Sequence, residues 1–299
     1  MNKNLNELEF AIITPSYKPD FERCRLLVES IERCVPDHVK QYIIVSQRDA
    51  KLFRQLSSSR VEIIIIEALL SDWIVQLPMF ERKWLTYYKP FMTNGWLIQQ
   101  LVKLYAALAI RADVLLFCDS DMAFIRPFEM SILFKDGKLA LIRTPHQTQN
   151  VQRWIRSSMH MLGLQVQKNS YINYVGNFVS WRRDNALKMM AYIEQLNHKK
   201  LIKVILNNSL SGISEYTIYG VFVEHILGIS QAGHFPFEGE LIKSLWHKPA
   251  NTVAEINALF DSVEDHHIGV LVQSTTGVPL DVYRHKVEGL WEKYAAIPT

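Results

Sequence analysis

Near the middle of the chain stands Val114-Leu115-Leu116-Phe117-Cys118-Asp119-Ser120-Asp121-Met122-Ala123-Phe124, in which two carboxylates follow an apolar run. A continuous apolar run of this length is typical of a strand buried on both faces of a largely parallel sheet. Open α/β sheets bind ligands at the carboxyl ends of such strands. Carboxylate oxygens beside a bound diphosphate suit Mg²⁺ or Mn²⁺. The stretch therefore predicts a metal and polyphosphate site at Asp119 and Asp121.

The alternative for this Asp-x-Asp is a helix cap or turn pair, because the tripeptide is common. Packing does not explain two carboxylates at the end of a buried strand, because an unpaired buried carboxylate is costly. The apolar strand before the pair and the apolar segment after it favour the metal site.

The composition is that of an ordinary globular chain, with 299 residues, 48% hydrophobic residues, and 33 Lys and Arg against 30 Asp and Glu. There is no dense basic block, so a nucleic-acid partner is not indicated. Residues 1–9 are polar and unlike a signal peptide, and no apolar run is long enough to span a membrane. Cys24 and Cys34, in one expected helix, are too far apart for a disulfide, which favours a reducing, cytoplasmic setting. Contact with a membrane surface is left open.

Strand and helix patterns alternate, which predicts an α/β fold with a mixed, mostly parallel sheet flanked by helices in a single domain. The expected strands are 10–13, 42–46, 61–66, 114–118, 138–144, 172–181, 241–246 and 268–273. The expected helices are 21–34, 96–110, 151–162, 183–197, 215–227 and 253–260. Residues 69–88 are expected to form a loop with a short helix, and the last 26 residues a tail or covering element. The chain has neither the G-x-G-x-x-G turn of dinucleotide-binding enzymes nor the G-x-x-x-x-G-K-[ST] loop of P-loop NTPases. The best evidence for either class of enzyme is therefore missing.

Four landmarks follow one another along the chain: Asp119-Ser120-Asp121, the loop at Gly176-Asn177, Glu215 at a helix start, and His247 after a late strand. In this order they resemble the nucleotide-sugar-dependent glycosyltransferases of the GT-A fold. The resemblance covers about residues 9–250. It extends to a set of bacterial GT-A-like proteins with a Trp-x-x-Gln-Gln-x-x-Lys helix, here Trp96 to Lys103, and a Ser-Glu-Tyr, here Ser214 to Tyr216.

The resemblance implies a role for each matching residue. The nucleotide-sugar donor would be bound by Thr14, Pro15, Ser16, Tyr17, Arg48, Asp49, Gln100, Lys103, Asp119 and Ser120. The acceptor would be bound by Gly176, Asn177, Trp181 and Tyr216. Asp119, Asp121 and His247 would hold Mn²⁺ or Mg²⁺, and Glu215 would be the general base of an inverting transfer. Residues 9–145 would form the nucleotide-sugar half, 146–250 the acceptor half and 251–299 a covering segment.

The implied activity is transfer of a sugar from a nucleotide diphosphate donor, a UDP-sugar first, to a hydroxyl of a glycan or glycolipid in bacterial cell-surface synthesis. One alternative is a sugar nucleotidyltransferase, which would usually need a glycine-rich loop after the first strand, and residues 14–20 have none. Another is a module that binds a sugar nucleotide or glycan without catalysis.

Several residues have a structural alternative. Glu215 could serve only its helix, in which case a retaining mechanism without a base becomes the better account. His266 and His267 rival His247 as metal ligands, with His234 behind them. Lys103 could pack its aliphatic stem on the core, or it could supply positive charge at the leaving group. Arg126 could likewise supply charge at the leaving group, or it could pair with a nearby carboxylate. Asp49 could be a turn residue, and Trp181 and Trp246 could be core residues.

Overall fold

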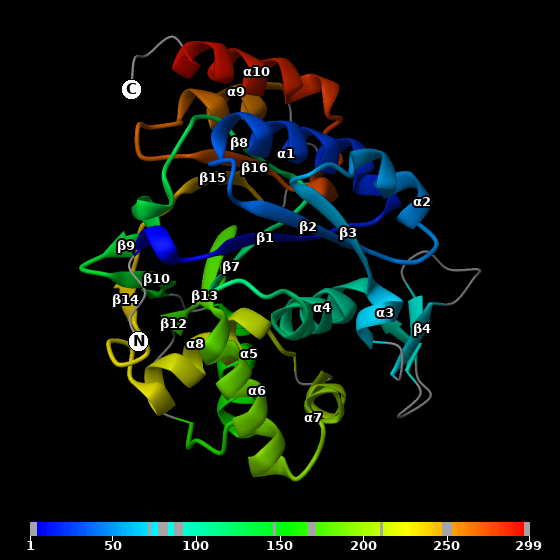
Figure 1. The fold of residues 1–299 in the computed structure, drawn as a ribbon, viewed down its shortest axis with the longest axis vertical. Coiled ribbons are helices and arrows are strands. Elements are labelled where there is room, and N and C mark those ends of the chain that lie inside the picture. The colour runs from blue at the N-terminus through cyan, green and yellow to red at the C-terminus, as the bar shows by residue number, and fades with distance from the viewer. Residues whose placement is uncertain are drawn as a thin grey trace. The chain divides into compact units, whose positions relative to one another are not determined.

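The computed structural model describes residues 5–70, 73–76, 83–86, 92–145, 148–166, 172–209, 212–246 and 253–295. Helices and strands alternate along the chain (Figure 1), so the expected α/β class is confirmed. A five-stranded sheet has the order β13 (Phe178–Arg182), β7 (Val114–Cys118), β1 (Phe10–Pro15), β2 (Lys40–Val45) and β3 (Val61–Ile65). Every residue of β1 and β7 is buried, as the apolar runs predict.

The chain folds into two compact units, each assembled from three segments. The first unit comprises residues 1–11, 65–116 and 133–238, and the second comprises residues 12–64, 117–132 and 239–299. The expected division into consecutive parts at residues 145 and 250 is not tested by this grouping and stays a prediction.

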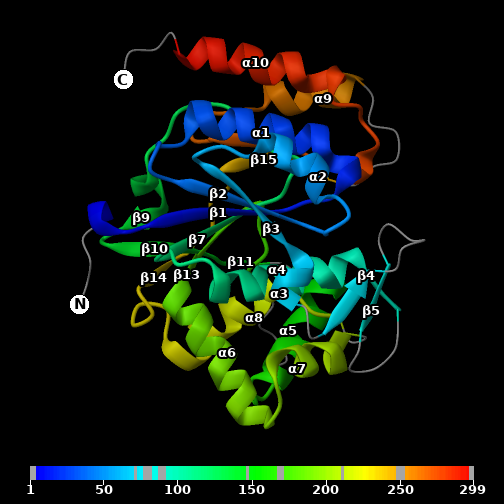
Figure 2. The ribbon, with the colours of Figure 1, turned by 45° about the vertical axis from the view of Figure 1, so that its right-hand side comes forward.

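In the second unit, α1 (Phe21–Cys34) joins β1 to β2, and α2 (Ala50–Phe53) precedes β3. A separate sheet has the order β15 (Ile242–Leu245), β16 (Gly269–Val272) and β8 (Met122–Phe124). Strand β16 is parallel to β15 and antiparallel to β8, with Leu271 opposite Met122. Helices α1, α9 (Val253–Asp261) and α10 (Asp281–Ala295) lie together in both ribbon views (Figure 2).

The tail expected over the last 26 residues is largely helix α10. Its buried residues, Tyr283, Val287 and Trp291, recur every four positions and form a narrow apolar stripe. The indole N–H of Trp291 donates to the carbonyl oxygen of Phe124 over 2.8 Å. The helix is therefore packed against the unit rather than trailing from it.

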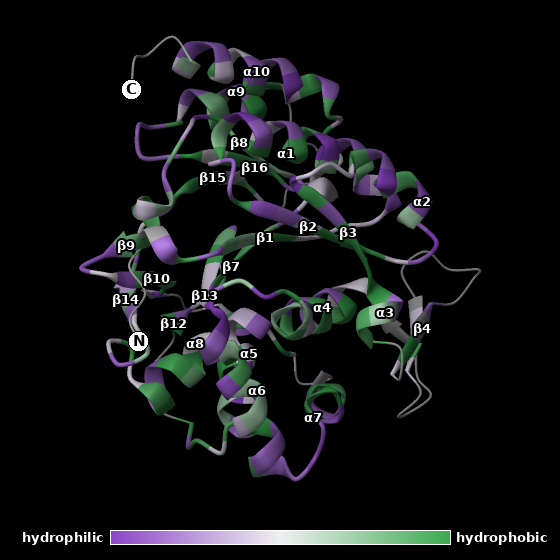
Figure 3. Ribbon diagram, in the orientation of Figure 1, coloured by the Kyte–Doolittle hydropathy of each residue, from purple (hydrophilic) through white to green (hydrophobic). Residues whose placement is uncertain are grey.

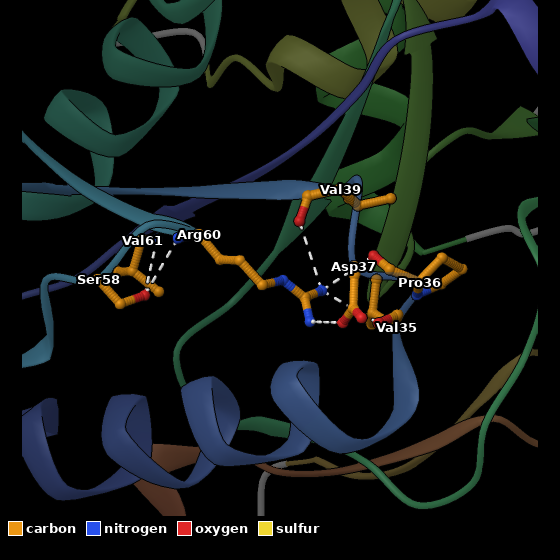
Figure 4. Close-up of polar contacts among 7 residues, drawn as sticks. All are labelled: Val35, Pro36, Asp37, Val39, Ser58, Arg60 and Val61. Atoms are coloured by element: carbon orange, nitrogen blue, oxygen red, sulfur yellow. Dashed lines mark hydrogen bonds and ion pairs between the residues drawn. The ribbon is translucent and has the colours of Figure 1, made fainter.

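Arg60 fastens the connection between α1 and β2 to the start of β3 (Figure 4). One terminal nitrogen, Nη2, donates to the carbonyl oxygens of Val35 and Pro36, each over 3.0 Å. The other, Nη1, lies 2.9 Å from the carboxylate of Asp37. Ser58 Oγ accepts from the backbone N–H of Arg60 itself over 3.2 Å. One guanidinium thus satisfies carbonyls that no regular element would satisfy.

In the first unit, helices pack around α4, whose residues are mostly hydrophobic, whereas α10 of the other unit is mostly hydrophilic (Figure 3). The helices described are α3 (Ile66–Leu70), α4 (Gly95–Ala109), α5 (Gln149–Met161), α6 (Arg183–Asn197), α7 (Leu201–Asn208) and α8 (Glu215–Phe222), which continues as a π-helix over Val223–Leu227. Helix α4 contacts α3, α6 and α8. These helices cover much of its apolar surface, and Trp96 and Leu108 are exposed.

Short strands complete the first unit. They are β4 (Ile74–Gln76), β5 (Lys83–Thr86), β6 (Met92–Asn94), β9 (Phe134–Lys135), β10 (Lys138–Ile142), β11 (Thr144–Pro145), β12 (Ile172–Asn173) and β14 (His234–Phe237). The loop expected over residues 69–88 is wrong where β4 and β5 pair in antiparallel fashion. Helix α7 and strand β14 were not expected. No helix within the described residues has the length and apolar character needed to cross a membrane.

Candidate functional site

Asp119 and Asp121 directly follow β7, as the sequence predicts, and lie in the turn that leads to the unexpected strand β8. The turn is closed by the backbone N–H of Met122, which donates to the carbonyl oxygen of Asp119 over 3.2 Å. Ser120 between them is buried. The buried strand therefore delivers two carboxylates to one tight turn in the second unit.

The carboxylate of Asp121 is held from a distant part of the chain. The backbone N–H of Ser274 donates to Asp121 Oδ2 over 2.7 Å. Ser274 begins the short 3-10 helix Ser274–Thr276 that follows β16, and β16 pairs with β8 beside Asp121. Burial and the neighbouring Asp119 carboxylate raise the pKa of Asp121 to about 7.

Asp20 is a third carboxylate of this cluster, and the sequence reasoning missed it. It closes the 3-10 helix Lys18–Asp20 after β1 and is 6% exposed. Its side chain is hydrogen-bonded to the hydroxyl of Ser274 and is repelled by the carboxylate of Asp119. Arg23 Nη1 lies 3.7 Å from Asp20 Oδ1. Burial raises the pKa of Asp20 to about 6. Its position after the first strand was a usable signal, because loops at the carboxyl ends of neighbouring parallel strands converge.

The expected nucleoside-binding loops also belong to the second unit. Asp49 Oδ2 accepts from the backbone N–H of Lys18 over 2.9 Å, and its other oxygen lies 3.4 Å from Arg48 Nε. Thr14 is buried and its hydroxyl accepts from Gln41 Nε2 over 3.0 Å. Asp49 thus links the loop after β2 to the loop after β1.

Pro15, Ser16 and Tyr17 continue from β1 into the same loop. Pro15 ends the strand, and the Ser16 backbone N–H donates to the carbonyl oxygen of Ile44 over 3.0 Å. Tyr17 is half-buried and precedes the 3-10 helix that holds Asp20. The predicted loop of residues 14–17 therefore leads directly to Asp20, the third carboxylate of the cluster.

The described residues contain no group of three or more His, Cys, Asp or Glu side chains arranged to hold a metal. Mg²⁺ usually takes one or two carboxylates and completes its shell with waters and substrate phosphates. The oxygen donors of Asp119 and Asp121 fit a cation of this kind, shared with a phosphate ligand. They do not fit a site closed by protein side chains alone.

The histidine ligands expected from the sequence have different outcomes. His247 lies outside the described residues. His267 Nδ1 accepts from the backbone N–H of Glu264 over 2.9 Å, so its neutral form carries the proton on Nε2 and offers no free lone pair. His266 is exposed and lies 3.4 Å from Glu264. His234 has both ring nitrogens hydrogen-bonded, to Tyr219 and Leu139, so it does not fit a metal ligand.

The side chain of Arg126 contacts several other residues of the second unit. Its guanidinium donates to the carbonyl oxygens of Glu264 and Asp265 and lies over the ring of Tyr294, 3.9 Å from the centroid. Nη1 also lies 3.9 Å from Asp265 Oδ1, which agrees with the alternative that Arg126 pairs with a carboxylate.

Glu215 begins α8 in the first unit and is 1% exposed. Ser214 caps the helix by accepting from the Thr217 N–H over 3.3 Å, as expected. The Glu215 backbone N–H donates to Gln100 Oε1 over 2.9 Å. Lys103 Nζ lies 3.2 Å from Glu215 Oε1 and donates to Tyr216 Oη over 2.8 Å. Gln100 and Lys103, expected to bind the donor, thus form one buried cluster with the expected base Glu215 and with Tyr216, expected to bind the acceptor.

The remaining acceptor candidates lie in the first unit. Trp181 is 1% exposed and stacks on Tyr219 at 4.6 Å between ring centroids, which makes it a core residue rather than a sugar platform. A Cβ on Gly176 would lie 2.3 Å from Ile142 Cδ1, so this glycine permits close packing. Within the described residues, Asn177 Oδ1 is buried without a hydrogen-bond partner. Trp246, by contrast, is 41% exposed.

Residues 8–297 match the model of DUF6492, a family of unknown function. The chain belongs to the DUF6492 family. No curated protein matches this DUF6492 chain.

The solved structures that are similar to this DUF6492 chain include two glycosyltransferases. The crystal structure of mouse xyloside xylosyltransferase 1 in its apo form has a TM-score of 0.45 and 8% identity, over 91% of this chain and 99% of that one. The galactosyltransferase LgtC, in complex with donor and acceptor sugar analogues, has a TM-score of 0.45 and 11% identity, over 96% of this chain and 97% of that one. Likenesses at this level carry no argument about what the chain does.

Proposed function

We propose that this DUF6492 protein transfers a sugar from a nucleotide diphosphate donor to a hydroxyl acceptor, with Mn²⁺ or Mg²⁺ held by Asp119 and Asp121. The supporting observation is the acidic cluster of the second unit, in which two of three carboxylates have a raised pKa. Buried like charges disfavour one another, and a divalent cation would relieve that repulsion. The donor class, with a UDP-sugar first, and a glycan or glycolipid acceptor rest on the sequence resemblance, as does the bacterial cell-surface pathway. The proposed cytoplasmic location rests on the spacing of Cys24 and Cys34.

The chain's own residues would bind and orient the donor. Asp119 and Asp121 would hold the cation, which when bound supplies charge neutralisation at the diphosphate leaving group. The loop of Thr14 to Tyr17 and the Arg48-Asp49 pair would contact the nucleoside. Asn177, whose buried oxygen has no partner among the described residues, would accept a hydroxyl of the acceptor.

Activation of the acceptor hydroxyl has two candidate courses. In the first, Glu215 is the general base, held ionised by the N-terminus of α8, and the transfer inverts the anomeric carbon. The second is favoured by the burial of Glu215 and its ion pair with Lys103, because a carboxylate engaged in this way is a poor proton acceptor. Glu215 is then structural, and the transfer proceeds with retention and no dedicated base.

Thermal melting tests the donor site directly. The protein would be melted with UDP, GDP, CDP and ADP, each with Mn²⁺ and with EDTA, beside Asp121→Ala and the control Asp261→Ala, an exposed carboxylate at the end of α9. A ligand at a hundred times its dissociation constant stabilises the native state by about 2.7 kcal/mol. We expect one nucleotide to raise Tm only with Mn²⁺, in the wild type and Asp261→Ala but not in Asp121→Ala. No shift with any nucleotide would leave Asp119 and Asp121 as a turn pair.

Turnover separates the remaining candidates once a donor is known. Loss of a general base costs about 10²- to 10⁴-fold in rate, so Glu215→Gln would lose that much kcat in the inverting course. A loss of only a few-fold, with an NMR coupling constant that shows retention in the product, would favour the second course. Nucleotide binding without turnover of any sugar donor would favour the binding module. Release of pyrophosphate from UTP and a sugar phosphate would identify the nucleotidyltransferase.

A further inference from the structure

Ser274 contacts two carboxylates of the acidic cluster through different groups. Its backbone N–H donates to Asp121 Oδ2 over 2.7 Å, and its hydroxyl is hydrogen-bonded to the side chain of Asp20. The pairing of Leu271 with Met122, and the backbone N–H of Val272 on the carbonyl oxygen of Asp121, fix this approach. The pairing of β16 with β8 thus places Ser274 beside Asp121.

We infer that Ser274 is a positioning residue that presents Asp121 to the cation through a single oxygen, so that the site selects Mg²⁺ and Mn²⁺ over Ca²⁺. This inference rests on the proposed metal site. Oδ2 accepts the Ser274 N–H, and the carboxylate also receives a backbone hydrogen bond from Asp121 itself. We take Oδ1 as the oxygen that faces a cation, because Oδ2 is already turned toward Ser274.

One-oxygen binding discriminates between these cations because their shells differ. Ca²⁺ takes about 6–8 oxygens and commonly binds a carboxylate through both of its oxygens. Mg²⁺ requires a near-octahedral shell at about 2.0–2.1 Å and keeps several waters, which suits a carboxylate that offers one oxygen. Partners that orient a metal ligand typically change metal affinity by about 10- to 100-fold. A backbone N–H on one oxygen of Asp121 therefore favours the smaller ion.

Two substitutions separate the contacts of Ser274. Ser274→Ala removes the hydroxyl that faces Asp20 and keeps the N–H that faces Asp121. Ser274→Pro removes both, so the difference between the two variants reports the N–H. Proline is tolerated at the first position of a helix, and the preceding Gln273 has φ −55° and ψ 131°, a conformation that proline permits in its predecessor.

The experiment measures Mn²⁺ binding by EPR in the presence of saturating UDP, followed by displacement of Mn²⁺ with Ca²⁺. We expect the wild type and Ser274→Ala to prefer Mn²⁺ to a similar degree. Ser274→Pro should bind Mn²⁺ about 10- to 100-fold more weakly and lose at least tenfold of its preference over Ca²⁺. A Ser274→Pro protein with the wild-type preference would overturn the inference. If the wild type itself binds no Mn²⁺, the proposed metal site fails, and this inference fails with it.

Asp121→Asn gives a second measurement if Ser274→Pro does not fold. With the Ser274 N–H in place, the amide oxygen of the substituted side chain would be drawn to that donor, and its NH₂ group would face the cation. We therefore expect Asp121→Asn to bind Mn²⁺ as poorly as Asp121→Ala. Retention of Mn²⁺ binding within tenfold of the wild type would mean that Ser274 does not fix the carboxylate.

Discussion

His234 is a buried histidine with both ring nitrogens engaged. Nδ1 lies 3.1 Å from the carbonyl oxygen of Leu139 and Nε2 lies 2.8 Å from the Tyr219 hydroxyl. Because Nδ1 faces an acceptor, it must donate, and Nε2 accepts from Tyr219, which in turn accepts from the Arg182 backbone N–H. Burial lowers the pKa of His234 to about 4.

Acid should therefore destabilise the protein through His234. Between pH 6.5 and 4 the unfolded state binds a proton that the folded state does not, so the free energy of unfolding falls as pH falls, by about 3 kcal/mol in all. His234→Leu should be less stable at pH 7 by about 2 kcal/mol, because it strands the Leu139 carbonyl, but should lose less on acidification. Urea unfolding from pH 7 to pH 4 measures both effects. The exposed His266→Gln serves as control, and equal slopes for His234→Leu and wild type would contradict the prediction.

Lys103 and Glu215 form an ion pair whose side chains are 6% and 1% exposed. Removal of one member of a buried pair costs about 3–5 kcal/mol, because the remaining charge stays in a poorly solvating site. We expect Lys103→Met and Glu215→Gln each to be destabilised on this scale, and the double variant to be more stable than the sum of the two losses predicts. Urea unfolding of the four proteins gives the coupling energy. Additivity within about 0.5 kcal/mol would show that the two residues do not depend on each other.

The residues of the candidate site were predictable from sequence to the extent that their signal is local. Asp119 and Asp121 directly follow an apolar strand, and Ser214 directly precedes α8. Asp20 and Ser274 reach the same cluster only because β16 pairs with β8 and the loop after β1 bends toward them. The position of Asp20 after β1 was a usable signal, but the contacts of Ser274 leave no spacing pattern in the sequence.

At the scale of elements, Arg60 decides how the connection after α1 is held. Its side chain is 15% exposed and donates to carbonyl oxygens of the 35–39 segment. Arg60→Met would keep the aliphatic stem and leave those carbonyls without their donor, for an expected loss of about 2–3 kcal/mol. Arg54→Met, at an exposed position of the neighbouring 3-10 helix, is the matched control. Urea unfolding should separate the two, and a similar stability for both would mean that water replaces the guanidinium.

Elements with broad hydrophobic periodicity were predicted well, and those with narrow or interrupted patterns were not. Helix α6 has the predicted bounds of Arg183 and Asn197. Helix α10 was missed because its apolar stripe is one residue wide per turn. Strand β14 was missed because Pro236 interrupts it, but β14 is an edge strand, where proline is tolerated.

At the scale of the whole molecule, the alternation of strands and helices was enough to predict the α/β class. The interleaving of the two units was not predictable, because each unit is assembled from three segments that are far apart in the sequence. Local periodicity encodes each element's buried face but not which distant element covers it.

Hydrogen exchange can test whether those distant segments of the second unit respond to one ligand together. The candidate donor site draws on residues 16–20, 119–122 and 273–277, which no continuous stretch of sequence contains. With UDP and Mn²⁺ we expect slower amide exchange in all three segments, because a ligand that binds only the native state raises the free energy of every opening that destroys its site. The Ser274 amide should be among the most protected, since its N–H is already hydrogen-bonded to Asp121. Asp121→Ala should abolish the effect in all three segments at once. Protection of residues 16–20 alone would instead indicate nucleoside binding without the acidic cluster, and would separate the nucleotide site from the metal site.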